Sequence, residues 1–221
     1  MARVDLFTFI HKAIRTMLYE TGKQLQTADV TDAAELDAVA GAIRSTLRLL
    51  DDHAEHEDSD IFPDFKRFDT ATIEELEGQH VALHAKEDAV LAALDTVYNT
   101  QGDEAKLAAG DELLRAYNEM SAYCLMHMSH EERTALPISI ENLTDEQLHG
   151  IHAKIESKIP PEVMGQWMRW IIPSMNFHDM RTVLTAIISN APPAVVDNIG
   201  MIATETLGSE RWTTIRQRIG V

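Results

Sequence analysis

Apolar residues recur every three or four positions through roughly the first 140 residues, which is the spacing of one face of an α-helix. In residues 4–27, for example, Phe7, Ile10, Ile14 and Met17 form the first part of such a stripe. Few β-branched runs occur, and the sustained alternation typical of a β-strand is absent from the sequence. The pattern therefore predicts an all-α protein whose first helix lies within residues 4–27.

The second and third helical segments each open with a predicted capping box, in which a polar side chain and an acidic residue three positions later satisfy the first backbone amides. The second segment opens at Thr31–Asp32 with Glu35 and ends near Pro63. The third opens at Thr72 with Glu75 and continues to residue 97. Both boxes indicate the start of a long helix.

A fourth apolar stripe runs from about Glu112 to the residues before Pro137, and Gly102 and Gly110 bracket the turn that precedes it. Four long helices joined by short connections are typical of an up-down-up-down four-helix bundle. We predict this bundle as the architecture of the larger part of the chain.

Residues beyond 143 carry helical signals of their own. Thr144 with Gln147 forms a further capping box, and Pro161 and Pro192–Pro193 suit the first turn of a helix. Residues 1–145 hold 12 Lys and Arg against 29 Asp and Glu, whereas residues 146–221 hold seven of each. We therefore predict a bundle domain over residues 1–143 and a helical C-terminal extension over residues 144–221.

Charge and cysteine content exclude several classes of function. The net charge of −17 makes nucleic acid and anionic membrane surfaces poor partners, because both carry negative charge. Cys124 is the single cysteine, so neither an internal disulfide nor a zinc site with two thiolates can form. Residues 1–20 are too charged for a signal peptide, and no apolar run reaches the length of a membrane span. We expect a cytoplasmic protein.

One motif occurs twice, on the second and fourth helical segments. Residues 53–63 and 127–137 both read H-x-x-H-E-(D/E)-x-x-x-(F/L)-P. Positions four apart in a helix share a face. His53 with Glu57, and His127 with Glu131, can therefore point together into the bundle interior.

The spacing of these groups along the chain predicts that they lie at one level of the bundle. Glu57 and His80, like His53 and His84, are placed symmetrically about residues 68–69. Symmetry about residues 105–106 places groups of the fourth helix at the same level, and symmetry about residue 32 does so for the first helix. The layer is therefore about one helical turn (~6 Å) thick. The predicted layer contains His11, His53, Glu57, His80, His84, His127 and Glu131.

Seven such groups would be costly to bury without partners, and a metal ion removes this cost. Five imidazoles and two carboxylates exceed the needs of one ion with an open position, but they suit two octahedral ions that share bridging carboxylates. Nitrogen and oxygen donors without thiolate favour iron, manganese or zinc over copper(I) or an iron–sulfur cluster. No Glu-x-x-His pair stands at the centre, which argues against a ferritin-type site.

Over roughly residues 4–140 the sequence resembles the hemerythrin-like domains. The resemblance rests on the order His11, His53-x-x-x-Glu57 followed by Phe62-Pro63, His80, and His127-x-x-x-Glu131. It implies a four-helix bundle that holds a non-haem di-iron centre with an oxo or hydroxo bridge, in which manganese or zinc could substitute. The ending H-x-x-x-E is similar to that of a bacterial subgroup, whereas oxygen carriers place an Asp five positions after the histidine.

The resemblance implies the first two of three kinds of function, and the neutral, tryptophan-containing residues 146–221 beside an acidic metal domain motivate the third. The first is binding or sensing of O₂, nitric oxide or peroxide at the di-iron centre. The second is an enzyme that uses the same metals for peroxide disproportionation, nitric oxide reduction or iron-centre repair. The third is a regulatory module in which the metal or its oxidation state changes how residues 144–221 bind a protein partner or a second copy of the chain.

Several neighbouring residues admit two interpretations. His84 either binds metal or orients a carboxylate that does. His56 and His130 either support or replace ligands, or they lie partly exposed beside the bundle seam, which we favour. The acidic run Asp51–Asp60 either guides cations toward the site or forms a solvated helix face, and the solvated face is the more frequent case.

Overall fold

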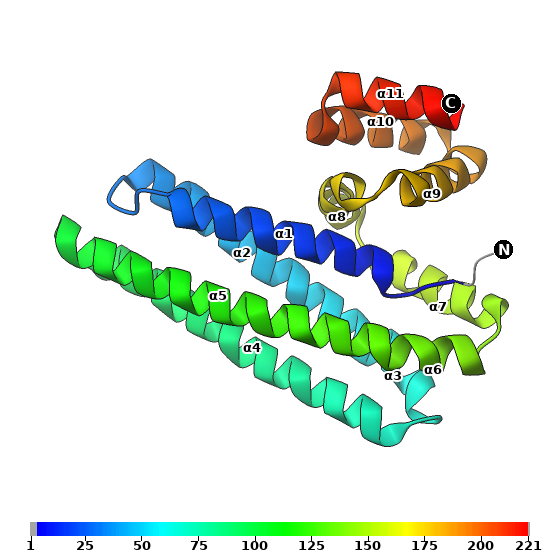
Figure 1. Cartoon of the computed structure of the whole chain (residues 1–221), viewed down its shortest axis with the longest axis horizontal. Helices are drawn as coiled ribbons and strands as arrows, with labels where there is room; N and C mark the ends of the chain where they lie inside the picture. The colour runs from blue at the N-terminus through cyan, green and yellow to red at the C-terminus, as the bar shows by residue number, and fades with distance from the viewer. Residues whose placement is uncertain (1–3, 221) are drawn as a thin grey trace. The chain divides into compact units, whose positions relative to one another are not determined.

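The computed structural model describes residues 4–220, apart from the side chains of residues 189 and 190, and every element in that part of the chain is helical (Figure 1). The prediction of an all-α fold is therefore confirmed. Among the described residues, no helix combines the length and the apolar character needed to cross a membrane.

Four long helices lie side by side and form the predicted bundle: α1 (Thr8–Thr27), α2 (Ala33–His56), α4 (Thr70–Asn99) and α5 (Asp103–Arg133) (Figure 1). The loops between them are short, so consecutive helices alternate in direction. The helices α4 and α5 pack along each other, and α2 packs on α4. A buried hydrogen bond joins Thr21 of α1 to Thr46 of α2, and the Tyr117 hydroxyl of α5 donates to the Leu18 carbonyl of α1.

The helix that begins as α2 continues through a π-helical turn, η1 (Glu57–Ile61), into α3 (Phe62–Lys66). A π turn contains one more residue than an α turn and shifts the faces that follow it. Glu57, Asp60, Ile61 and Phe62 are all buried. Pro63 lies in the first turn of α3, where a proline is tolerated, so the helical path extends slightly past the predicted end near this residue.

The helix starts differ in part from the predicted capping boxes. Asp32 caps α2 as predicted by accepting from the amides of residues 34 and 35, but Glu35 accepts from the amide of Asp29 and does not close the box. The cap of α4 is Asp69, which accepts from the amide of Thr72. The prediction of Thr72 as the cap was wrong, because Asp69 takes this place and Thr72 lies within the first turn.

The helix α5 begins nine residues earlier than predicted, directly after Gly102. Gly102 has a φ of 84°, which favours glycine. Gly110, predicted to end the turn, lies inside α5, where a Cβ atom would come within 2.9 Å of Cγ2 of Val30. Close approach of two segments, rather than a turn, explains this glycine.

Two shorter helices follow the bundle, α6 (Ala135–Asn142) and α7 (Asp145–Lys158). The amide of Thr144 donates to the Gln147 side chain, and the amide of Gln147 donates to the Thr144 hydroxyl, so the predicted capping box is confirmed. An apolar cluster of buried Phe7, Phe62 and Leu148 with further residues of α3, α4, α6 and α7 covers this end of the bundle.

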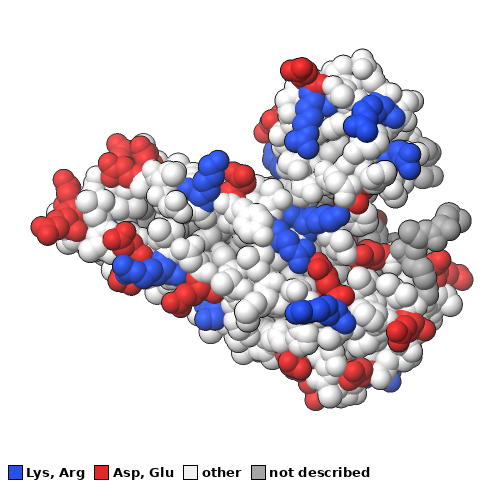
Figure 2. Space-filling model, in the orientation of Figure 1, with Lys and Arg blue, Asp and Glu red and all other residues white. Residues whose placement is uncertain are grey.

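By its internal contacts the chain divides into two units. The first contains the residues up to Phe7 and Met17–Glu156, and the second contains Thr8–Thr16 and the chain from Ser157 onward. Acidic side chains are spread along the bundle helices on the face that Figure 2 shows, in accordance with the composition. The predicted boundary at residues 143–144 stays a prediction.

The second unit contains α8 (Pro161–Ser174), α9 (Phe177–Asn190), α10 (Pro193–Leu207) and α11 (Ser209–Ile219). The predicted starts of helices at Pro161 and Pro193 are confirmed. The unit has its own apolar core, in which Ile172, Met180 and Leu184 are almost completely buried. Residues 144–220 are therefore helical, as predicted.

Candidate metal centre

The repeated motif places two histidine–carboxylate pairs in the bundle interior. On the path from α2 into η1, Nε2 of His53 lies 3.2 Å from Oε1 of Glu57. On α5, Nε2 of His127 lies at the same distance from Oε1 of Glu131. Each pair is four residues apart, so the two side chains of a pair leave the helix on one face.

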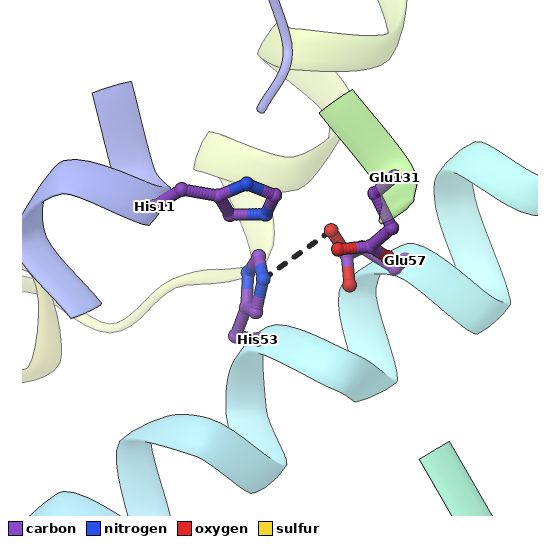
Figure 3. Close-up of side chains that lie close together, drawn as sticks. All are labelled: His11, His53, Glu57 and Glu131. Carbon is purple, nitrogen blue, oxygen red and sulfur yellow. Dashed lines mark ion pairs between the residues drawn. The ribbon is translucent and has the colours of Figure 1, made fainter. Parts of the chain in front are cut away.

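The histidines of the other two helices complete the cluster. Nε2 of His80, on α4, lies 3.3 Å from Oε2 of Glu57 and 3.8 Å from Oε1 of Glu131. His11, on α1, points at the same carboxylates together with His53 (Figure 3). All four long helices thus contribute to one cluster.

The ligand atoms form two groups of four that share both carboxylates. One group is His11, His53, Glu57 and Glu131, and the other is Glu57, His80, His127 and Glu131. Within each group the atoms lie within 4.8 Å of one another. The arrangement therefore offers two positions for a cation, each with two imidazoles and the same pair of carboxylates.

The cluster is buried in an apolar environment. Glu131 and His11 are fully buried, and Glu57 is 1% exposed. Phe62 stacks on the His80 ring, with ring centroids 5.6 Å apart. Charges in such an environment interact strongly because little water screens them.

Two polar side chains orient the histidines of the second group. Nδ1 of His80 donates to Oδ1 of Asp58 over 2.8 Å, and Nδ1 of His127 donates to Oε1 of Gln79 over 3.0 Å. The Gln79 amide in turn donates from Nε2 to Nδ1 of His130 over 2.9 Å. These bonds fix the tautomer that carries its proton on Nδ1 and leaves the Nε2 lone pair facing the carboxylates.

The site attracts positive charge. Burial disfavours the protonated form of His80, but the neighbouring carboxylates of Asp58 and Glu57 outweigh this effect and raise its pKa to about 10. The two buried carboxylates, Glu57 and Glu131, lie close to all four imidazoles. Either protons or metal cations can balance these carboxylates.

A metal ion fits the donor set better than protons alone. Nε2 of His80 and Nε2 of His127 are buried and make no hydrogen bond in the described part of the chain. A buried polar atom without such a bond is costly, and a metal ion would use both lone pairs. Imidazole and carboxylate together are the donors of iron, manganese and zinc sites.

The structure does not bring His84 into this cluster. His84 is one turn beyond His80 on α4, but its side chain is 64% exposed and Nδ1 contacts Asp51 at 3.0 Å and Glu87 at 3.3 Å. The seven-residue layer of the sequence prediction is thus a cluster of six. The physical reason is that Asp51 and Glu87 give the imidazole two acidic partners away from the centre.

Four further residues lie next to the cluster or close to it: His56, Asp58, Gln79 and His130. His130 contacts Gln79, which contacts His127, so His130 supports the cluster through one intermediate. His56 lies 3.4 Å from the buried carboxylate of Asp60 and is not part of the cluster. Asp58 and Gln79 were missed in the sequence, although each directly adjoins a residue of the cluster.

The profile of a family described as the hemerythrin HHE cation binding domain matches residues 2–139. The matched stretch includes all six clustered residues. Neither the curated proteins nor the solved structures that were compared contain a match.

Proposed function

The chain belongs to the family of hemerythrin HHE cation-binding domains, and from this premise we propose that it is a non-haem di-iron protein that binds or senses O₂, nitric oxide or peroxide. The residues proposed to hold the two ions are His11, His53, Glu57, His80, His127 and Glu131. Manganese or zinc could occupy the same donors. The observation that carries the proposal is the sharing of Glu57 and Glu131 by two groups of ligand atoms.

Two cations explain this arrangement better than one. A single ion has no use for six donors if a position is to stay open for a small ligand. Two positions with two imidazoles each need both carboxylates in common, as the structure has them. Four donors at each position leave room in an octahedral shell.

A pair of ferrous ions in such a site would supply an open coordination position and electrons to a small oxidant. The protein's own contribution is orientation and exclusion of water. Asp58 and Gln79 hold the rings of His80 and His127, and the Phe62 ring covers one face of His80. Glu57 and Glu131 would offset part of the added positive charge inside the bundle.

Addition of O₂ to the anaerobic, iron-loaded protein tests the proposal. We expect absorption in the visible that appears with O₂ and reverses on deoxygenation. Glu131→Gln should abolish the absorption because it removes a charge that both positions share. Glu132→Gln is the matched control, since this neighbour on α5 is not part of the cluster.

The outcomes separate binding from turnover. Irreversible oxidation without a new visible band would contradict reversible O₂ binding. Nitric oxide is the second probe for the reduced protein. Steady-state consumption of H₂O₂ or nitric oxide, lost in Glu131→Gln and retained in Glu132→Gln, would show an enzyme that uses the same residues.

A further inference from the structure

A second group of metal-binding side chains lies on the surface of the bundle, apart from the buried cluster. Asp51 of α2 and His84 and Glu87 of α4 place one ligand atom each within 4.8 Å of the others. Nδ1 of His84 is the common contact, 3.0 Å from Oδ1 of Asp51 and 3.3 Å from Oε2 of Glu87. None of the three residues belongs to the two buried groups.

Burial of one carboxylate makes this group unusual for a surface cluster. Glu87 is only 5% exposed, whereas the side chains of Asp51 and His84 are 48% and 64% exposed. Burial, followed by a hydrogen bond from protonated Glu87 to Asp51 and by the negative charge of Asp51, raises the pKa of Glu87 to about 8. A buried carboxyl group beside a second carboxylate thus needs a proton or a cation.

The imidazole alone meets this need only in part. Protonated His84 would bring one positive charge to two carboxylates, and most of the ring is in water, where ion pairs contribute little. A divalent cation would bring two charges and would use the Nδ1 lone pair directly. We propose that Asp51, His84 and Glu87 form a second, surface-accessible site for a divalent transition metal such as manganese(II) or iron(II).

The geometry suits an ion that keeps part of its water shell. His84 and Glu87 are three residues apart on one helix, so they face the same side, and Asp51 approaches from the neighbouring α2. One nitrogen and two oxygen donors on an exposed surface leave coordination positions for water. Such a mixed set favours manganese, iron or zinc over calcium, which binds oxygen alone.

The second site shares helices but no ligands with the buried cluster. Asp51 is two residues before His53, and His84 is one turn after His80. The inference therefore does not depend on the proposed di-iron function and can be tested without it.

The test is a titration of the full-length Glu57→Gln/Glu131→Gln protein with Mn²⁺, in which electron paramagnetic resonance measures the free ion. These substitutions disable the buried cluster. We expect one bound ion. A further Glu87→Gln change removes a direct ligand, so it should weaken binding at least as much as the loss of an outer-shell partner does, which is roughly 10- to 100-fold. Asp88→Asn, an exposed neighbour with the same change of charge, should leave binding unchanged.

Nitrogen coupling identifies the ligand. Pulsed electron paramagnetic resonance of the bound Mn²⁺ should show coupling to an imidazole nitrogen, and His84→Ala should remove this coupling. Equal binding in the Glu87→Gln and Asp88→Asn proteins, or binding without nitrogen coupling, would overturn the proposal.

A second arm uses the otherwise unaltered chain after iron loading and removal of loosely bound iron, which empties an exposed site. Here His84→Ala should leave the iron content unchanged and should remove only the added Mn²⁺. Loss of iron on this substitution would assign His84 to the buried centre and would overturn the proposal. Failure of the di-iron function would appear separately, as iron content that does not depend on Glu57 and Glu131.

Discussion

At the scale of single residues, hydrogen bonds around the cluster determine where lone pairs point. Gln79 accepts a hydrogen bond from His127 and donates one to His130, so its amide has one orientation only. Asp58 has the same orienting role toward His80, with a carboxylate in place of an amide. Side chains that bind no metal themselves therefore contribute to affinity.

We expect Gln79→Leu to weaken metal binding by roughly 10- to 100-fold, because His127 loses the acceptor that fixes its ring. Competition with a coloured chelator measures the change. Gln79→Glu retains the acceptor for His127 and should bind nearly as well as the unaltered protein. Equal loss in both variants would show that bulk, rather than the hydrogen bond, matters at this position.

Spacing along the chain predicts most of the cluster but not its limits. The repeated His-x-x-x-Glu motif and the symmetric positions of His11 and His80 are local facts of sequence, and the structure brings these six residues together. His84 differs because the direction of its ring depends on Asp51 and Glu87, of which one lies on another helix. Gln79 and Asp58 carry no repeated pattern that would reveal them.

At the scale of helices, the type and number of elements follow from apolar periodicity, whereas their ends depend on competing caps. Asp69 and Thr72 are both good capping residues, and the structure uses Asp69. The start of α5 could not be predicted because residues 103–111 are polar or small apart from Leu107 and carry little apolar pattern. The π turn after His56 also has no clear sequence pattern, since it differs from an α turn by one residue.

The cap at Asp69 should make stability depend on pH. Hydrogen bonds from the Thr72 amide and then the Thr72 hydroxyl lower the pKa of Asp69 from 3.8. Its stabilisation is present above that value and is lost as the pH falls through the lowered pKa. We expect Asp69→Ala to lower the midpoint of thermal unfolding at pH 7, and the difference from the unaltered protein should shrink in acid.

The matched control for this cap is an exposed aspartate in the middle of a helix. Asp88→Asn should not change the pH dependence of unfolding. If Asp69→Ala and the unaltered protein differ by the same amount at acid and neutral pH, the charge of Asp69 does not stabilise the helix.

Replacement of two glycines by alanine should change the free energy of unfolding in opposite directions. Gly102, with φ 84° and ψ 136°, precedes α5 in a conformation that other residues adopt at a cost of about 1–3 kcal/mol, so Gly102→Ala should lower the free energy of unfolding. Gly41 lies exposed in α2 with no atom near its missing Cβ. Gly41→Ala should raise stability by roughly 0.5–1 kcal/mol. Chemical denaturation measures both, and destabilisation by Gly41→Ala would contradict the helix placement.

At the scale of the whole molecule, metal binding and folding are linked. A ligand that binds only the folded state adds about 2.7 kcal/mol when its concentration is a hundredfold above the dissociation constant. The buried cluster joins residues from all four bundle helices, so the bundle must be folded for metal to bind. We expect iron or manganese to raise the midpoint of thermal unfolding, measured by circular dichroism.

The same thermal unfolding measurement on the Glu57→Gln/Glu131→Gln protein separates stabilisation by metal in the buried cluster from unspecific effects of salt. In this variant only the smaller rise from an ion at Asp51, His84 and Glu87 should remain, whereas Glu55→Gln, an exposed neighbour, should behave as the unaltered protein. A metal-dependent rise of equal size in all three proteins would place the stabilising ion elsewhere.

The most direct test of the central claim is the metal content of the full-length protein after anaerobic iron loading and removal of loosely bound ions, with Mössbauer spectra of the same samples. The sharing of Glu57 and Glu131 predicts two irons per chain that are coupled to each other and are lost together in Glu57→Gln/Glu131→Gln. Glu55→Gln should retain both. A single iron per chain, or the same iron content with and without the two carboxylates, would contradict a dinuclear centre.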